Sequence, residues 1–166
     1  MFLSTSRCTA VVLLLLAASS AGYGQIKGQL TVGGKVIPLT SSYAYLAKGF
    51  FDETKNDTVV VLADGPLTDA LARDRSALSS QSDQGKLHFV QVTIDAKGQI
   101  INFLVGHNAF KLPPSGGSTE HKFESKVMDG KTISGTVFTA GPQSAPFGGP
   151  SYEYKVEFTA PIQPRK

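Results

Sequence analysis

The chain has 166 residues, of which 41% are hydrophobic and 17% are charged, a composition typical of a single globular domain. Its 16 lysine and arginine residues against 13 acidic residues give a formal net charge of +3, and the two signs are interspersed. This pattern argues against nucleic acid as a partner. Cys8 is the only cysteine and lies near the start of the chain, which excludes disulfides and thiolate metal sites from the remainder.

The first residues have the three parts of a secretory signal peptide. Arg7 supplies the positive end, residues 10–18 form an unbroken apolar run, and small residues follow it. At roughly 1.5 Å per residue this run is too short to cross a bilayer of about 30 Å. We therefore expect a signal peptide at 1–21 and a mature chain that begins at Gly22. The mature chain would be periplasmic or extracellular and would have no membrane span.

The first predicted hairpin has its turn at Gly33-Gly34. A pair of glycines can take the positive φ angles that tight hairpin turns require. The strand that follows, over 35–47, contains Pro38, which cannot donate a ladder hydrogen bond, so we expect it at an edge or bulged there. Residues 58–63 (TVVVLA) are a continuous apolar run, which predicts a short strand buried on both faces.

One face of that buried strand needs a cover, and the segment 66–78 is the predicted cover. Its apolar residues recur at roughly helical spacing, and Pro66 fits the first turn of a helix. We expect this to be the only helix. The polar stretch 79–85 then returns the chain to the sheet.

Residues 86–107 predict a central hairpin, because two runs rich in β-branched residues flank one tight turn. Two registers compete. A three-residue loop, with Gly98 in the left-handed region, places Val92 opposite Asn102. A two-residue loop places Val92 opposite Phe103 and matches the apolar faces better. We favour the three-residue loop on its turn chemistry.

Beyond the central hairpin, stretches rich in proline and glycine separate runs of alternating apolar and polar residues. The last such stretch has no periodicity, so we expect a long, mobile loop there. The expected elements are a loop over 108–119, a strand over 121–127, a turn at Asp129-Gly130, a strand over 131–140, the mobile loop over 140–151, and a strand over 152–158.

Together these elements predict an all-β fold, either an antiparallel β-sandwich or a small β-barrel, with about eight strands and one short helix. The choice between sandwich and barrel stays open. We expect a single domain over 25–162 and a disordered tail at 163–166.

Several phrases of the sequence resemble one known family. GQLTVGGKVIPLTSSYAY, VVVLADGPL, IDAKGQI, ISGTV and the closing YKVEFTAPI are similar to an exported bacterial β-domain family with no assigned activity. The resemblance covers nearly all of the mature chain. It implies an exported β-domain with the boundaries given above, and it implies no ligand, cofactor or catalytic residue.

The sequence contains none of the motifs that carry common enzyme chemistry. It has no G-x-S-x-G pentapeptide, no phosphate-binding G-x-x-x-x-G-K-[ST] loop and no dinucleotide fingerprint. Most of the acidic residues fall in predicted turns or on polar strand faces, where solvation explains them. We therefore assign no catalytic residue, no cofactor and no metal.

Binding residues are expected at one end of the sheet. In an up-and-down strand order the long connections fall at one end and the turns at Gly98 and Gly130 at the other, and loops on a rigid sheet are where binding residues concentrate. The candidate ligand-binding residues at the end with the long connections are His88, His107, His121 and Phe147.

Two functions remain open. We favour an exported, non-enzymatic binding or scaffold domain whose partner is a small apolar ligand or a protein. The alternative is a zinc-dependent enzyme, since three convergent imidazoles from His88, His107 and His121 would leave a fourth position of the metal open. In the favoured interpretation the histidines are ordinary polar residues at strand ends.

Overall fold

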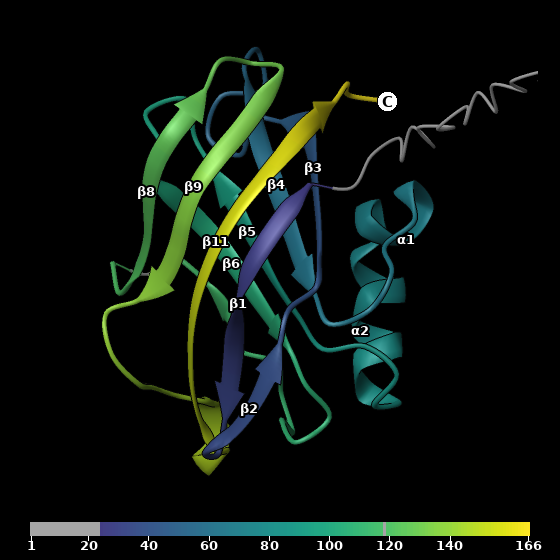
Figure 1. The fold of residues 1–166 in the computed structure, drawn as a ribbon, viewed down its shortest axis with the longest axis vertical. Helices are drawn as coiled ribbons and strands as arrows, with labels where there is room; N and C mark the ends of the chain where they lie inside the picture. Colours follow the sequence, from purple (N-terminus) through teal and green to yellow (C-terminus); the bar gives the residue numbers. More distant parts are fainter. Residues whose placement is uncertain (1–23, 118) are drawn as a thin grey trace, which may run out of the picture.

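The computed structural model describes residues 24–117 and 119–166, and it shows a mostly β fold with two short helices on one side (Figure 1). The predicted signal peptide at 1–21 lies outside the described residues. Among the described helices, none is long and apolar enough to cross a membrane. In chain order the elements are β1 Gln25–Val32, β2 Lys35–Pro38, β3 Ser41–Lys48, β4 Asn56–Ala63, α1 Asp69–Arg73, α2 Arg75–Asp83, β5 Phe89–Ile94, β6 Ile100–Gly106, β7 Ser115–Gly116, β8 His121–Met128, β9 Thr132–Thr139, β10 Gln143–Ser144, the 3₁₀ helix η1 Pro146–Gly148, and β11 Ser151–Gln163.

The long strand β11 organises the sheet. It pairs antiparallel with β1 and with β9, and its last residues, Ile162 and Gln163, pair in parallel with Ala44 and Tyr45 of β3. From β3 the sheet continues through β4, β5, β6 and β7, while β2 and β8 pair with β1 and β9. The strands therefore form one curled sheet, and the predicted all-β fold is confirmed. The parallel β11–β3 pair departs from the expected purely antiparallel pairing.

The sheet has 11 strands where about eight were expected, and the difference comes from three short pieces. The strand expected over 35–47 divides after Pro38 into β2 and β3. At the break, the Leu39 N–H donates to a carbonyl of β1 at 3.1 Å, and the Thr40 N–H donates to Ala63 of β4 at 2.8 Å. The chain thus passes from the β1 edge of the sheet to β4 directly after Pro38, where the sequence predicted an edge or a bulge. The other two pieces, β7 and β10, lie within the predicted loops.

Two helices, rather than the single one expected, cover the sheet. The Thr68 hydroxyl accepts the Leu71 N–H at 3.1 Å and begins α1. Asp74, with extended backbone, ends α1 and also begins α2, since its carboxylate accepts the Ala77 N–H at 3.0 Å. One aspartate therefore divides the predicted helix, and α2 runs on into the polar stretch 79–85 that was expected to return the chain to the sheet.

The hydrophobic core has two layers, one inside the curled sheet and one between the sheet and the helices. Strand β4 contributes to both. Val60 and Leu62 belong to the interior layer, whereas Val61 and Ala63 belong to the helix-side layer, and all four are fully buried. The predictions of a strand buried on both faces and of a helical cover are confirmed.

The central hairpin combines the two registers that the sequence allowed. Next to the turn Ile94 pairs with Ile100, as the three-residue loop requires. Farther from the turn Val92 pairs with Phe103, as the two-residue loop would require. Ile101 is the extra residue between these two regions, a β-bulge that shifts the register by one. The bulge satisfies both the turn chemistry and the apolar faces.

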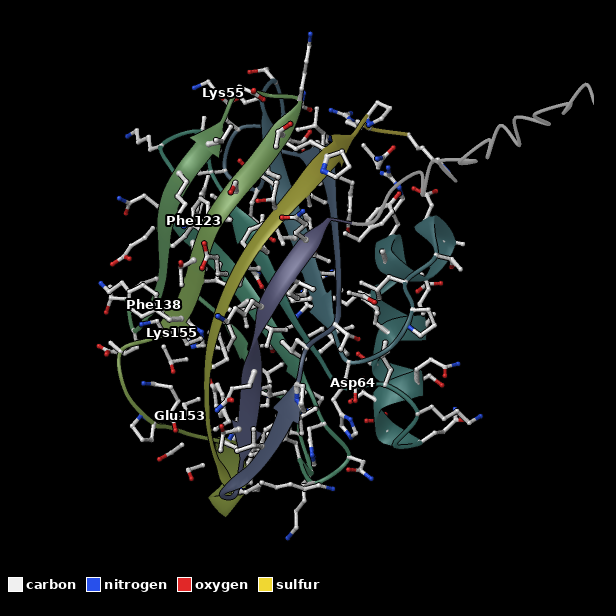
Figure 2. All side chains as sticks on the ribbon, in the orientation of Figure 1. Lys55, Asp64, Phe123, Phe138, Glu153 and Lys155 are labelled. Carbon is white, nitrogen blue, oxygen red and sulfur yellow. The ribbon has the colours of Figure 1, made fainter. Side chains whose placement is uncertain are left out.

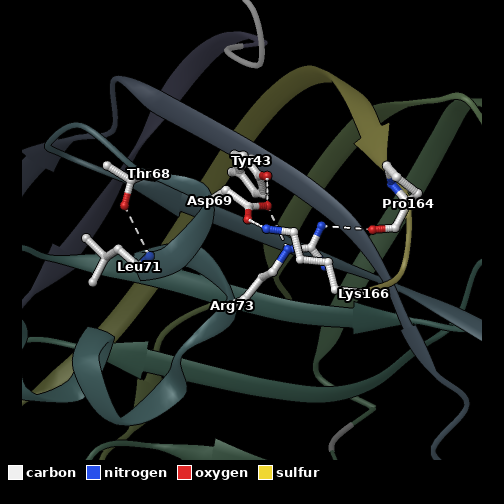
Figure 3. Close-up of polar contacts among 7 residues, drawn as sticks. All are labelled: Tyr43, Thr68, Asp69, Leu71, Arg73, Pro164 and Lys166. Atoms are coloured by element: carbon white, nitrogen blue, oxygen red, sulfur yellow. Dashed lines mark hydrogen bonds and ion pairs between the residues drawn. The ribbon is translucent and has the colours of Figure 1, made fainter.

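The residues expected to form a disordered tail, 163–166, are held against α1 (Figure 3). The Arg73 guanidinium donates to the Pro164 carbonyl at 2.9 Å and to the Asp69 carboxylate at 2.7 Å. The Lys166 ammonium also donates to Asp69. Pro164 therefore lies against the short helix through Arg73, and Lys166 lies there through Asp69.

The same carboxylate joins α1 to the sheet. The Tyr43 hydroxyl of β3 donates to Asp69 (Figure 3), and burial together with this hydrogen bond raises the pKa of Tyr43 to about 12. The Arg73 guanidinium lies over the Tyr45 ring, 4.6 Å from its centroid. These contacts fix α1 on β3 through polar groups, in addition to the apolar layer beneath it.

Candidate functional site

The two ends of the curled sheet differ in the length of their connections (Figure 1). The end that we call the loop end is made by residues 33–34, the two ends of the segment 64–88, and the loops 107–114 and 140–150. The opposite end, which we call the turn end, is made by the turns 49–55, 95–99 and 129–131. This is the division that counting turns predicted, except that the loop 108–119 runs back along β6 through β7.

His88 is fixed at the loop end by Asp64, which is labelled in Figure 2. Asp64 follows β4, and His88 precedes β5. The His88 backbone N–H donates to one carboxylate oxygen at 2.8 Å, and the ring Nδ1 lies 2.6 Å from the other. The carboxylate can only accept, so Nδ1 carries the proton and the Nε2 lone pair of neutral His88 is left as an acceptor.

His107 lies beside His88, with ring centroids 4.5 Å apart and planes at 33°. Its Nδ1 accepts the Ala109 N–H at 2.9 Å, so the proton of the neutral ring is on Nε2. That Nε2 is buried and has no hydrogen-bond partner among the described residues. Burial, then the positive charges of His88 and Lys35, lower the pKa of His107 against an opposing effect of Asp64. His107 is therefore a neutral, buried donor without an acceptor.

His121 lies in the interior of the curled sheet. Its ring stacks on Phe103 with centroids 3.6 Å apart, and its Nδ1 is 2.7 Å from the Tyr154 hydroxyl. Burial lowers the pKa of His121 to about 4. Phe110 and Tyr152 lie between His121 and His107, at centroid distances between 5.8 and 6.1 Å along the series. The structure thus brings His88 and His107 together and leaves His121 apart from them.

The three histidines do not assemble the zinc ligand set that the sequence allowed. Ligation would need all three imidazole nitrogens within about 2.1 Å of one point. Within residues 24–117 and 119–166, no three His, Cys, Asp or Glu side chains are grouped so that they could hold a metal ion. In addition, ligation through Nε2 of His107 would require Nδ1 to carry the proton, which conflicts with the hydrogen bond from Ala109. The geometry therefore gives a pair of oriented imidazoles, not a three-histidine centre.

Phe147, the fourth candidate, is 79% exposed at the tip of the loop 140–150. Its backbone has φ 54° and ψ 39°, and it is the one non-glycine residue with positive φ in the described part of the chain. The loop was expected to be mobile, but β10 pairs within it to Ser151 and Tyr152, and Ala145 is buried in the core. The loop is consequently anchored, and it presents Phe147 in a strained conformation.

One hollow lies on the outer face of the sheet. It is a groove of about 560 Å³ where β1, β11 and β9 meet, near the labelled Phe138, Glu153 and Lys155 in Figure 2. Gly28 lies at its floor, where an added Cβ would come within 2.3 Å of the Lys155 carbonyl. The groove is lined by charges of both signs, and no buried polar atom without a partner is known along it.

Three features of the loop end escaped the sequence analysis. Asp64 follows the buried run 58–63 directly, so its place at a strand end was available as a signal. The effect of Lys35 on His107 was not, because the two residues are distant in the chain and only the fold brings their charges to the same end of the sheet. The separation of His121 by the aromatic rings of Phe110 and Tyr152 also depends on packing that periodicity does not contain.

Family models, curated proteins and solved structures were all compared with this chain, and none of them matches it. The resemblance to an exported bacterial β-domain therefore stays a prediction. The function has to be argued from the site itself.

Proposed function

We propose that this chain is an exported, non-enzymatic binding domain whose loop end takes a ligand, or a segment of a protein partner, that offers an acceptor oxygen beside apolar surface. The observation that carries the proposal is the buried Nε2–H of His107, which has no acceptor among the described residues. A buried donor without a hydrogen-bond acceptor lowers the stability of the fold by about 1–3 kcal/mol. Such groups are therefore rare unless a ligand, a water molecule or a partner supplies the acceptor.

The surroundings of His107 favour an anionic acceptor. After burial and His88, Lys35 also lowers the pKa of His107, against an opposing effect of Asp64, so a positive side chain acts on this ring. A carboxylate oxygen would accept from His107 and would also be attracted by Lys35. His88 lies beside His107, and Asp64 holds its ring in place.

The exposed side chains of the loop end supply the apolar part. Phe147 is 79% exposed, and Val36 and Leu112 are about half exposed. A left-handed backbone costs a residue other than glycine roughly 1–2 kcal/mol, and here that cost keeps a large ring in solvent. Strained conformations cluster at functional sites, and an exposed aromatic ring held in one is suited to anchor a partner.

The fixed protonation of the pair supports binding over catalysis. The lone pair of His107 at Nδ1 is used by the backbone, so this ring is a donor that cannot also accept a proton at that atom. Its lowered pKa keeps it neutral near pH 7. A group with these properties orients a ligand rather than transferring a proton.

The test uses protein labelled with ¹⁵N at histidine and two probes whose alkyl chains differ by one carbon. Octanoate has an acceptor carboxylate and an apolar chain, whereas octyltrimethylammonium has the chain without an acceptor. We expect octanoate alone to shift the His107 Nε2–H resonance in a saturable manner and to leave the His121 resonances unchanged. In the unmodified protein octanoate should also shift the resonances of the neighbouring His88, and a His107→Phe variant should lose that shift.

Two results would contradict the proposal. The first is equal shifts with both probes, or none at His107. The second comes from zinc titration, where stoichiometric zinc binding that is lost in the His88→Ala, His107→Ala, His121→Ala variant would establish the metal-dependent alternative instead.

A further inference from the structure

The curled sheet has one seam that hydrogen bonds do not close. From β8 through β9, β11, β3, β4 and β5 to β6, each strand pairs with the next. Among the described strands, β8 pairs only with β9, and β6 pairs on its far side only with the two residues of β7. Figure 1 shows β8 at the edge of the sheet beside β9. We call the space between β8 and the start of β6 the β6–β8 seam.

The backbone of β8 presents hydrogen-bonding groups to this seam. The Ala140 N–H donates to the Glu120 carbonyl at 2.8 Å, which makes this pair a hydrogen-bonded position of the β8–β9 ladder. Such positions alternate in an antiparallel ladder, so the backbone groups of Lys122 and Glu124 point toward β9. Those of Phe123, between them, point into the seam, where no backbone group of the described residues pairs with them.

Two hollows follow the seam along the length of β8. One of about 190 Å³ lies between residues 98–100 and residues 121–123 of β8. The other, of about 460 Å³, lies between residues 96–98 and the second half of β8, and the two hollows share Gly98. Together they form one groove beside the free edge. The half-buried apolar side chains that line it are Ile100, Phe123, Met128 and Ile162.

The ring of Phe123, labelled in Figure 2, lines this groove without filling it. It packs toward the core residue Phe158, with centroids 6.1 Å apart and planes at 31°. It also lies over Gly135 of β9, where an added Cβ would come within 2.7 Å of the ring. The glycine thus lets the ring lie down on the sheet, and the groove above it stays open.

The devices that commonly guard an edge strand leave the first part of β8 open. Lysines and bulges are two such devices, and β8 has both at Lys126. Lys126 is the extra residue of a bulge between Ser125 and Val127, so the ladder is regular up to residue 125. Its ammonium is ion-paired with the exposed Glu157 of β11, which draws it across the outer face and away from the seam.

We infer that the β6–β8 seam binds an extended segment of a partner protein, which adds a strand to residues 121–125 of β8. Backbone groups that recur at every second residue are matched by another extended chain, and the apolar groove takes its alternate side chains. Residues 98–100 form the opposite wall, so a single strand has better access than the sheet edge of a second copy. This inference does not depend on the ligand proposed for the loop end.

The geometry also fixes which residues of the segment bond to β8. Phe123 points its backbone into the seam and its ring toward the core, and residues directly opposite one another share a face of the sheet. The residues of the segment that exchange hydrogen bonds with β8 are therefore those whose side chains enter the groove. The residues between them point their side chains to solvent and their N–H groups away from β8.

The probe is a capped peptide of seven residues with valine at every even position and threonine or lysine at the others. Two isomers carry N-methyl groups, one on the valines and one on the threonines. We expect the valine-methylated isomer to bind at least about tenfold more weakly than the unmethylated peptide, because it cannot donate to β8. The threonine-methylated isomer should bind within about threefold of it.

Amide hydrogen exchange in ¹⁵N-labelled protein locates the added strand. In the free protein the Phe123 amide should exchange fast, whereas those of Lys122 and Glu124 should be protected by β9. Bound peptide should protect Phe123 and leave the other two nearly unchanged. Protection of Phe123 before peptide is added would overturn the inference. The edge would then be occupied by a second copy if the protection rises with protein concentration, and by a segment of this chain if it does not.

A pair of variants tests the groove. Phe123→Ala should weaken peptide binding by about tenfold, because the ring supplies apolar contact to the valines. Phe138→Ala is the matched control, since Phe138 is also half-buried but lines the groove on the outer face. The inference is overturned if the peptide does not bind, if the two methylated isomers bind equally, or if the two alanine variants lose the same affinity.

Discussion

Acid should destabilise this fold through His121, and the size of the effect follows from its burial. The pKa of His121 is lowered from 6.5 to about 4 because the folded interior disfavours the charged ring. The unfolded chain binds a proton near pH 6.5, so stability is complete above that pH and is lost as the pH falls from 6.5 through about 4. The loss is about 2 kcal/mol at about pH 5 and about 3 kcal/mol below pH 4.

Urea unfolding followed by far-ultraviolet circular dichroism measures this loss. With a urea dependence of about 1–3 kcal/mol per molar, the midpoint should fall by about 1 M between pH 7.5 and pH 5. The matched variant is His121→Phe, which keeps a ring on Phe103 but does not titrate. It leaves the buried Tyr154 hydroxyl without its partner, at a cost of about 1–3 kcal/mol that is the same at both pH values.

The comparison is therefore made within each protein, between the two pH values. The lowered pKa of His107 adds a further acid loss, but it does so equally in both proteins. In His107→Phe the acid destabilisation that comes from His107 should disappear, and the loss of about 2 kcal/mol assigned to His121 should remain. If His121→Phe loses as much stability as the unmodified chain on going to pH 5, the argument from burial is wrong.

Three further predictions concern the scaffold. Phe147→Asn should raise stability by about 1 kcal/mol because asparagine tolerates the left-handed backbone, while Phe51→Asn, at an exposed phenylalanine with ordinary φ, should bring no comparable gain in a thermal melt. Gly28→Ala should cost about 2 kcal/mol or more, because the new Cβ would lie 2.3 Å from the Lys155 carbonyl. Gly117→Ala, with 3.4 Å to its nearest neighbour, is the control, and equal losses in denaturant would contradict the close approach. Asp69→Asn should loosen both α1 and the C-terminal residues, so trypsin should cut after Arg73 faster than in the unmodified protein, and an unchanged rate would refute that link.

Periodicity and turn chemistry predicted the parts of the fold that depend on neighbours in sequence. The run 58–63 has no alternation, and β4 is indeed buried on both faces. In the central hairpin the two competing signals were both real, since each describes a different stretch of the same strand pair. Sequence reasoning chose between them because it had no reason to expect a bulge at Ile101.

The features that sequence could not predict depend on partners distant in the chain. The parallel contact of β11 with β3 arises because a 13-residue strand extends past the end of β1, and no local pattern encodes that overhang. The same limit applies to the candidate site. Counting connections placed the histidines at one end of the sheet, but only the packed structure shows that aromatic rings separate His107 from His121 and that His107 lacks an acceptor.

The pairing of β1 with β11 has a consequence for how the chain folds. Gln25 pairs with Thr159, so one edge of β1 has no hydrogen-bond partner until β11, the last strand, is in place. Because β11 also joins β9 and β3, the hydrogen bonds that link the two halves of the sheet form late and over long sequence separations. Such contacts slow folding and leave unpaired strand edges exposed in the meantime. A growing chain that ends between β9 and Ser151 would therefore contain local hairpins that are not yet joined into one sheet. The rate of complete folding would then depend on the pairing of β11 with the strands already formed.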